Sequence, residues 1–139
     1  MNAMDKQYGV GIGWRPEIAG YVAGLPGLRF TEVVAESVRP AALPPALREL
    51  RARGVTVIPH GVKLSLGGAE PVDRHRVAHL AECAEALGAP LVSEHIAFCR
   101  AGGMEVGHLT PLPRTRDSVA VMVDNVRLVQ KDLPVPIAL

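Results

Sequence analysis

The stretch VTVIPHGVKLSLGG, residues 55–68, begins with β-branched and apolar residues and then reaches Pro59, His60 and Gly61. The apolar run predicts a buried strand that ends at the histidine. Strands that run into an exposed turn usually finish on Asp, Asn, Gly or Lys, so an imidazole in this place calls for a chemical explanation. Whether it has one depends on the fold around the strand.

Strands and helices alternate along the chain. The predicted strands are residues 8–14, 28–36, 55–61, 89–98 and 134–139, the predicted helices are 15–24, 44–54, 71–88 and 115–133, and a glycine-containing loop is expected at 101–107. Short connections between alternating strands and helices imply right-handed crossovers and a parallel sheet buried on both faces. The predicted fold class is therefore α/β.

Two α/β architectures compete. A dinucleotide-binding open sheet needs G-x-G-x-x-G after its first strand, but the glycines here are followed by Trp14 and Pro16, where that pattern requires glycine. A (β/α)8 TIM barrel needs eight units in about 250 residues. The 139-residue chain reaches only the fifth strand. We therefore expect a single domain, 1–139, that is the N-terminal half of a TIM-type barrel and ends within strand five.

Composition excludes several function classes. The chain is 48% hydrophobic and 21% charged, which is typical of a globular protein, and its net charge of +1 comes without any basic block. A nucleic-acid partner is not expected. The N-terminal segment has no signal-peptide pattern and no apolar run is long enough to span a membrane, so we expect a cytoplasmic protein without membrane contact. Cys83 and Cys99 are expected to be reduced structural thiols.

Three polar residues stand at the predicted ends of neighbouring strands: Glu36 ends strand two, His60 strand three and His95 strand four. Function in parallel α/β folds gathers at the carboxyl ends of the strands, and adjacent strands lie about 4.8 Å apart. Two imidazoles and a carboxylate there suit Zn, Fe or Mn. The alternative is that each histidine is only a hydrogen-bonded polar residue at the barrel mouth.

Other polar residues have weaker claims. Glu94 adjoins His95, and because alternate residues of a strand face opposite ways, we expect His95 and not Glu94 to face the site. Glu32 is either a buried carboxylate behind the site or an ion-pair partner, and Ser65 is either a ligand-binding hydroxyl or part of a plain turn. His75 and His79 form HxxxH on a helix and are expected on a solvated face.

Six segments together resemble a known family. They are, in order, GVGIGWRPEIA, FTEVVAES, PHGVKLSLGG, LVSEHIAF, LTPLPRT and VQKDLPVPIAL. The chain is similar in these to the multinuclear non-haem iron-dependent oxidases, also called domain of unknown function 692 or UPF0276. HGVKLSLG and SEHIA are the specific motifs.

The resemblance implies a TIM barrel with two or three iron ions at its mouth, and oxidation of ribosomally made peptides, often at cysteine, with a partner protein that delivers the peptide. It implies His60 and His95 as iron ligands. The family's AEN segment is AES here, so Glu36 is retained while Ser37 replaces the usual asparagine. The family's next ligand, a glutamate after strand five, lies beyond Leu139.

Two other functions remain open at this stage. One is a barrel with a redox-inert divalent metal, of the sugar isomerase or endonuclease type. The other is an inactive unit that serves only in folding or assembly. Whatever the function, half of a barrel leaves strand edges without a neighbouring strand, and we expect the chain to self-associate through these edges.

Overall fold

The computed structural model describes residues 7–139; residues 1–6, on which the expected absence of a signal peptide partly rests, lie outside the described residues. Five strands form one sheet in the order β1-β2-β3-β4-β7, with every pair parallel, and two further strands form an antiparallel hairpin. The strands are β1 (Gly11–Gly13), β2 (Phe30–Val34), β3 (Thr56–His60), β4 (Val92–Ser93), β5 (Phe98–Ala101), β6 (Met104–Thr110) and β7 (Ile137–Ala138). The helices are α1 (Ala19–Gly24), α2 (Pro45–Ala52), α3 (Arg74–Leu87) and α4 (Arg116–Asp132), with 3-10 turns η2 (Pro16–Ile18), η3 (Ala35–Ser37) and η4 (Pro40–Ala42).

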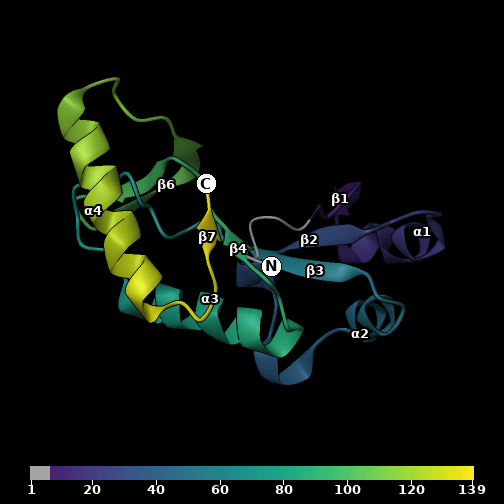
Figure 1. Ribbon diagram of the computed structural model, residues 1–139. Coiled ribbons are helices and arrows are strands. Elements are labelled where there is room, and N and C mark those ends of the chain that lie inside the picture. Colours follow the sequence, from purple (N-terminus) through teal and green to yellow (C-terminus); the bar gives the residue numbers. More distant parts are fainter. Residues whose placement is uncertain (1–6) are drawn as a thin grey trace.

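One face of the sheet is buried under the helices. Val33, Val57 and Val92 point to this side, each 1% exposed or less, and belong to one core cluster with leucines of α2 and α3 such as Leu47 and Leu80. In Figure 1 the helices follow the sheet in chain order, from α1 and α2 on one side to α4 on the other. Strand order that follows the chain, with helices on one side, is the arrangement of part of a (β/α)8 barrel.

The other face of the sheet is only half covered. In β2 the buried residues alternate with Phe30, Glu32 and Val34, which are half-buried, and in parallel pairing Val34 lies beside His60. Phe30 covers β1 at Gly11, where a Cβ would lie 2.6 Å from the Phe30 ring. In a closed barrel this face would be the interior. The predicted α/β class and half-barrel architecture are confirmed, whereas burial of both faces is not found in this part of the chain.

Several predicted boundaries are wrong. The first helix, expected at 15–24, is a 3-10 turn followed by the six-residue α1, and the strand expected at 89–98 is reduced to β4. The loop expected at 101–107 is instead the turn and second strand of the β5–β6 hairpin. Its turn is made by Gly102 and Gly103, with φ angles of +59° and +74°. Two consecutive residues with positive φ form the tight type of hairpin turn whose twist matches that of the flanking strands.

Helix α3 packs against η3 through a histidine and a cysteine. The Nε2–H of His79 donates to the carbonyl oxygen of Ala35 at 2.8 Å, and the Cys83 sulfur lies 3.5 Å from His79 Nε2. His75 is exposed, as expected for the HxxxH pair, but His79 is half-buried, so the prediction of a solvated face is wrong for His79. The cause is tertiary: the turn after β2 folds back over α3.

No helix within residues 7–139 combines the length and the apolar character needed to cross a membrane.

We predict that Cys83 is chemically inert in the folded chain. Burial raises the pKa of its thiol to about 11, with the carboxylates of Glu36 and Glu82 acting in the same direction. At pH 8 only about one such thiol in a thousand is a thiolate, so in a Cys99→Ala background a disulfide reagent should react about 100-fold or more slower with the native chain than with the chain unfolded in guanidinium. Equal rates in the two states would contradict this packing.

Candidate metal centre

Two imidazoles meet at the carboxyl end of the sheet. His60 is the last residue of β3, and His95 lies two residues beyond the end of β4. Their Nε2 atoms are 2.9 Å apart, their ring centroids are 4.6 Å apart, and the rings are inclined at 74°. His95 was expected to end its strand; because β4 stops at Ser93, it instead begins the following loop. The two Nε2 atoms nevertheless lie within hydrogen-bond distance of each other.

A chain of polar contacts supports His60 from behind. The His60 Nδ1 lies 2.8 Å from Ser93 Oγ, and the Ser93 hydroxyl donates to Glu32 Oε1 at 3.0 Å. The pairing of His60 with Ser93 in neighbouring strands sets this contact. Glu32 is therefore a hydrogen-bonded carboxylate behind the histidine pair, and it forms no ion pair with any residue of 7–139. Ser93 received no role from the sequence, since only the strand register places it beside His60.

Glu36 does not end a strand as expected. β2 ends at Val34, and Glu36 lies in the turn η3 on the exposed surface. Its Oε1 accepts a hydrogen bond from the backbone N–H of Val62 at 2.9 Å. Glu36 thereby holds the segment that follows His60. Burial lowers the pKa of His60 below its usual value, and the nearby carboxylates of Glu32 and Glu36 partly oppose this shift.

Glu94 is turned away from the two histidines. It is only 4% exposed, and its carboxylate accepts from the backbone N–H of Leu64 at 3.0 Å and of His95 at 2.7 Å. A Cβ placed on Gly61 would lie 2.7 Å from Glu94 Oε2, so glycine at 61 gives the carboxylate its room. Burial raises the pKa of Glu94. The carboxylate acts as a brace between the loops after β3 and β4.

Ser65 is a structural residue of the loop after β3. It is 6% exposed, has a φ of +58°, and its Oγ accepts from the backbone N–H of Cys99 at 3.0 Å. Its carbonyl oxygen accepts from the N–H of Gly68 at 2.9 Å, which closes a turn. Both of these hydrogen bonds of Ser65 are made within the chain, one of them in a turn. The hydroxyl joins this loop to strand β5.

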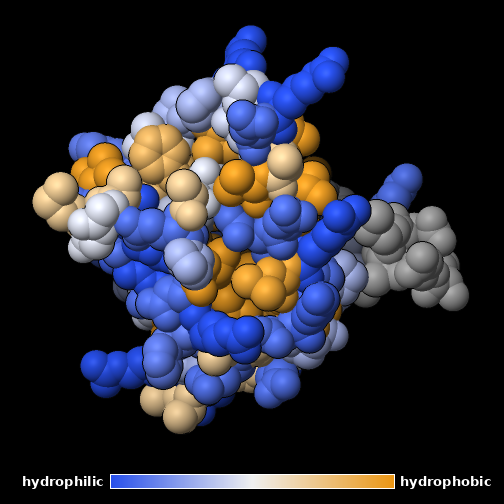
Figure 2. Space-filling model, turned by 90° about the vertical axis from the view of Figure 1, so that its left-hand side faces the viewer, coloured by the Kyte–Doolittle hydropathy of each residue, from blue (hydrophilic) through white to orange (hydrophobic). Residues whose placement is uncertain are grey.

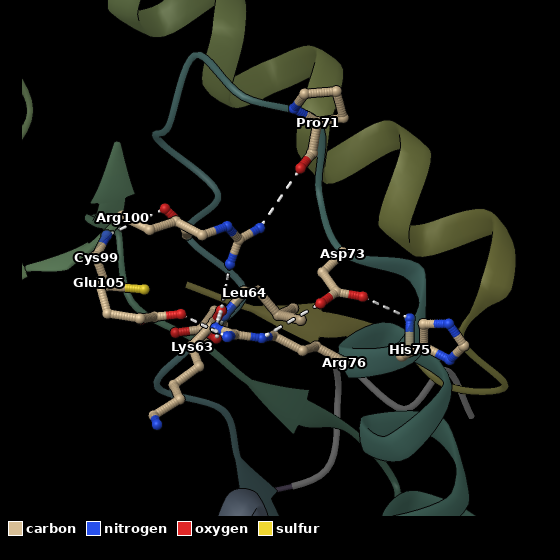
Figure 3. A network of polar contacts seen from close by, with 11 residues as sticks. Lys63, Leu64, Pro71, Asp73, His75, Arg76, Cys99, Arg100 and Glu105 are labelled. Carbon is tan, nitrogen blue, oxygen red and sulfur yellow. Dashed lines mark hydrogen bonds and ion pairs between the residues drawn. The ribbon is translucent and has the colours of Figure 1, made fainter. Parts of the chain in front are cut away.

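A second polar network ties the hairpin to α3 (Figure 3). The Arg76 guanidinium donates to Glu105 of β6 at 2.5 Å and to the carbonyl oxygen of Lys63 at 2.9 Å, and it lies 3.6 Å from Asp73. Arg100 of β5 donates to the same Lys63 carbonyl at 3.1 Å. The loop after His60 is thus clamped between the hairpin and α3. Arg76 also lowers the pKa of Glu105 through its hydrogen bond.

The histidine pair alone falls short of the three or more side chains that a metal site needs. Within residues 7–139, no group of three or more His, Cys, Asp or Glu side chains is arranged to hold a metal ion. Of the residues selected from sequence, the structure brings His60, His95 and Glu32 together, places Glu36 at the rim, and keeps Glu94 and Ser65 apart as structural residues. The pair can offer two nitrogens to an ion, which is fewer than a metal site of three or more ligands requires.

Comparison with known proteins assigns the family. The model of a family described as "RiPP precursor modification enzyme MbnB/TglH/ChrH" matches residues 9–139, where RiPP denotes a ribosomally synthesised and post-translationally modified peptide. The chain belongs to this family. Its matched segment contains both histidines and the whole described sheet.

Curated relatives in the family carry the uninformative name UPF0276 protein. One from Streptomyces avermitilis is 60% identical over 137 residues, covering 94% of this chain and 28% of that protein. Others, from Anaeromyxobacter sp. and Acaryochloris marina, are each 30% identical and are matched over 45% and 49% of their length. The chain thus spans less than half the length of these relatives.

A solved structure supports the fold. The chain is similar to a crystal structure of D-psicose 3-epimerase in the presence of D-fructose, with a TM-score of 0.57 and 15% identity, over 91% of this chain and 50% of that one. At this identity the likeness shows the fold alone. It agrees with half of a TIM-type barrel.

We predict that Ser65 contributes to stability. Replacing it with alanine removes the acceptor for the buried Cys99 N–H and leaves a Cβ at positive φ. Ser65→Ala should lower the free energy of unfolding by about 1–3 kcal/mol, measured by guanidinium denaturation. Ser65→Gly should cost less, because glycine accepts this backbone conformation. Unchanged stability in Ser65→Ala would contradict the structural role.

Proposed function

We propose that this chain supplies the N-terminal half of a non-haem iron-dependent oxidase that modifies a ribosomally made precursor peptide, and that His60 and His95 hold iron. The observation that carries the proposal is the convergence of the two Nε2 atoms, 2.9 Å apart, at the carboxyl end of the parallel sheet. The family assignment gives the peptide as the class of substrate. The sequence resemblance supports iron and oxidation at cysteine.

The donor set fits such an ion. Two imidazole nitrogens that bind one metal at about 2.1 Å, at right angles, lie about 3 Å apart, and this is close to the separation found here. Imidazole with carboxylate is a ligand combination used by iron, manganese and zinc. Iron, when bound, supplies the one-electron chemistry by which O₂ oxidises a substrate.

This chain's own residues provide placement. The Ser93–Glu32 pair fixes one histidine, Glu94 braces the loop that carries the other, and Glu36 holds the segment after β3. Rigid support of this kind keeps ligands in position without reorganisation. The precursor peptide and a protein that delivers it are the proposed partners.

The remaining ligands come, in this proposal, from further βα units that complete the barrel. Three features support this: one sheet face is half covered, the chain spans less than half of its relatives' length, and an apolar groove of about 830 Å³ lies between the start of α4 and the segment 111–115. The groove includes Ile96, which follows His95, and Val119, which are 58% and 63% exposed. Figure 2 shows hydrophobic side chains gathered on this side of the molecule. A helix of the next unit would cover them.

The first experiment tests the histidines. His60→Ala and His95→Ala should each weaken Fe²⁺ binding by at least about tenfold under anaerobic conditions, as measured by equilibrium dialysis, because each removes one of two converging nitrogens. His75→Ala is the matched control, since His75 is exposed on α3 and should leave Fe²⁺ binding unchanged. Normal affinity in both site variants would reject the metal centre.

Oxygen consumption separates the proposed oxidase from a barrel enzyme with a redox-inert metal. The iron-loaded protein, completed by the rest of the barrel and given its precursor peptide, should consume O₂, whereas an isomerase-type enzyme should not. Metal-dependent turnover without O₂ consumption would favour the second function.

A third experiment tests the open surfaces. The isolated chain 1–139 should self-associate or aggregate in light scattering, because β7 is an edge strand of the sheet formed by residues 7–139 and the groove beside α4 is apolar. Val119→Lys should reduce this association, while Tyr21→Lys, an equally exposed change on α1, should have little effect. A stable monomer that carries two or more irons per chain would show that the sequence closes its own site.

A further inference from the structure

Three hydrogen bonds link the candidate site into one chain of side chains. His95 Nε2 lies 2.9 Å from His60 Nε2, His60 Nδ1 lies 2.8 Å from Ser93 Oγ, and Ser93 Oγ lies 3.0 Å from Glu32 Oε1. The four residues come from β2, β3, β4 and the loop after β4. The contact between Ser93 and Glu32 joins residues 61 positions apart in the sequence. The position of the hydrogen in each of these three bonds determines which ring nitrogen of His60 is protonated and which carries a lone pair.

The direction of donation follows from the acceptor at the end of the chain. An ionised carboxylate only accepts, so the single hydroxyl hydrogen of Ser93 is donated to Glu32. The Ser93 oxygen can then only accept from His60, which places a hydrogen on His60 Nδ1. A neutral imidazole has only one N–H. With its hydrogen on Nδ1, His60 carries a lone pair on Nε2, and this nitrogen accepts a hydrogen bond from the Nε2–H of His95.

We propose that Ser93 and Glu32 are positioning residues that fix His60 as its Nδ1–H tautomer and aim its Nε2 lone pair at the point shared with His95. The proposal deepens the proposed function, because a metal ligand needs this lone pair. It concerns the metal-free protein, however, and so can be tested separately from iron binding.

The strand register makes this arrangement specific to Ser93. His60 pairs directly with Ser93 in parallel β3 and β4, so the hydroxyl stands beside the ring without a loop between them. Glu32 lies on β2, on the same face of the sheet, where Val34 is the residue paired with His60. A carboxylate that accepts the N–H of a ligating histidine sets its tautomer and orientation, and in this proposal Glu32 does so through the Ser93 hydroxyl.

The test is the nitrogen spectrum of the histidines. In the metal-free full chain labelled with ¹⁵N-histidine, long-range ¹H–¹⁵N correlation spectra distinguish a protonated ring nitrogen from an unprotonated one, and the His60 signals are identified by their loss in His60→Gln. We expect a protonated Nδ1 and an unprotonated Nε2 for His60 in the unmodified protein at neutral pH. A protonated Nε2 with a bare Nδ1 would overturn the proposal without any variant.

The variants separate positioning from packing. Ser93→Ala should convert the single tautomer into a mixture of the two, whereas Ser93→Thr, which keeps the hydroxyl on a strand, should restore the Nδ1–H form. Glu32→Gln should also lose the single tautomer, since an amide no longer forces the direction of donation. Half-buried His79, whose Nε2–H donates to the Ala35 carbonyl oxygen, should keep its signals in every variant and reports an intact fold. An unchanged His60 tautomer in Ser93→Ala would overturn the proposal, even if His60 and His95 bind iron as proposed.

Discussion

The parallel pairing of β2, β3 and β4 is the constraint on which the rest of the structure depends. Its register places Val34 beside His60 and His60 beside Ser93, so alternate residues of three strands share one face. The opposite residues, such as Val33 and Val57, are held under the helices by burial of apolar surface. A shift by one residue would bury the polar residues and expose the valines, which fixes the register firmly.

Loops beyond the strand ends then carry out the finer positioning. Glu94 accepts two backbone N–H groups from different loops, and Ser65 and Arg76 attach the hairpin to the segment after β3. The contacts of Glu94 with Leu64 and of Ser65 with Cys99 satisfy backbone N–H groups that would otherwise be buried without partners. Burial also lowers the pKa of His60, which favours the neutral imidazole at physiological pH. The fold and the chemistry of the histidine pair are therefore supported by the same contacts.

The open side of the molecule has the character of an interface. One sheet face is half covered, the β7 edge is unpaired within the described residues, and the groove beside α4 is lined with apolar groups such as Ile96 and Val119. In the proposed function, these surfaces are where further βα units would complete the barrel, and the chain covers 45% and 49% of two relatives and half of the epimerase structure.

Sequence alone determined the alternation of strands and helices, because apolar periodicity and glycine or proline breaks are local signals. It also singled out His60 and His95, since both follow apolar runs that read as strands. It failed at the hairpin, where the Gly102–Gly103 turn was taken for a loop, and at Glu36, because the end of β2 is set by the turn η3.

Only the tertiary structure decided which polar groups act together. Glu94 and His95 are adjacent in sequence, yet the Glu94 carboxylate accepts from the backbone of Leu64 whereas the His95 ring contacts His60. Ser93 contacts the ring of His60, 33 residues away, because β3 and β4 are paired. His79 became half-buried because Ala35 folds over it. Hydrogen bonds between distant strands depend on register and on where each strand stops, and neither is encoded in the local pattern of residues.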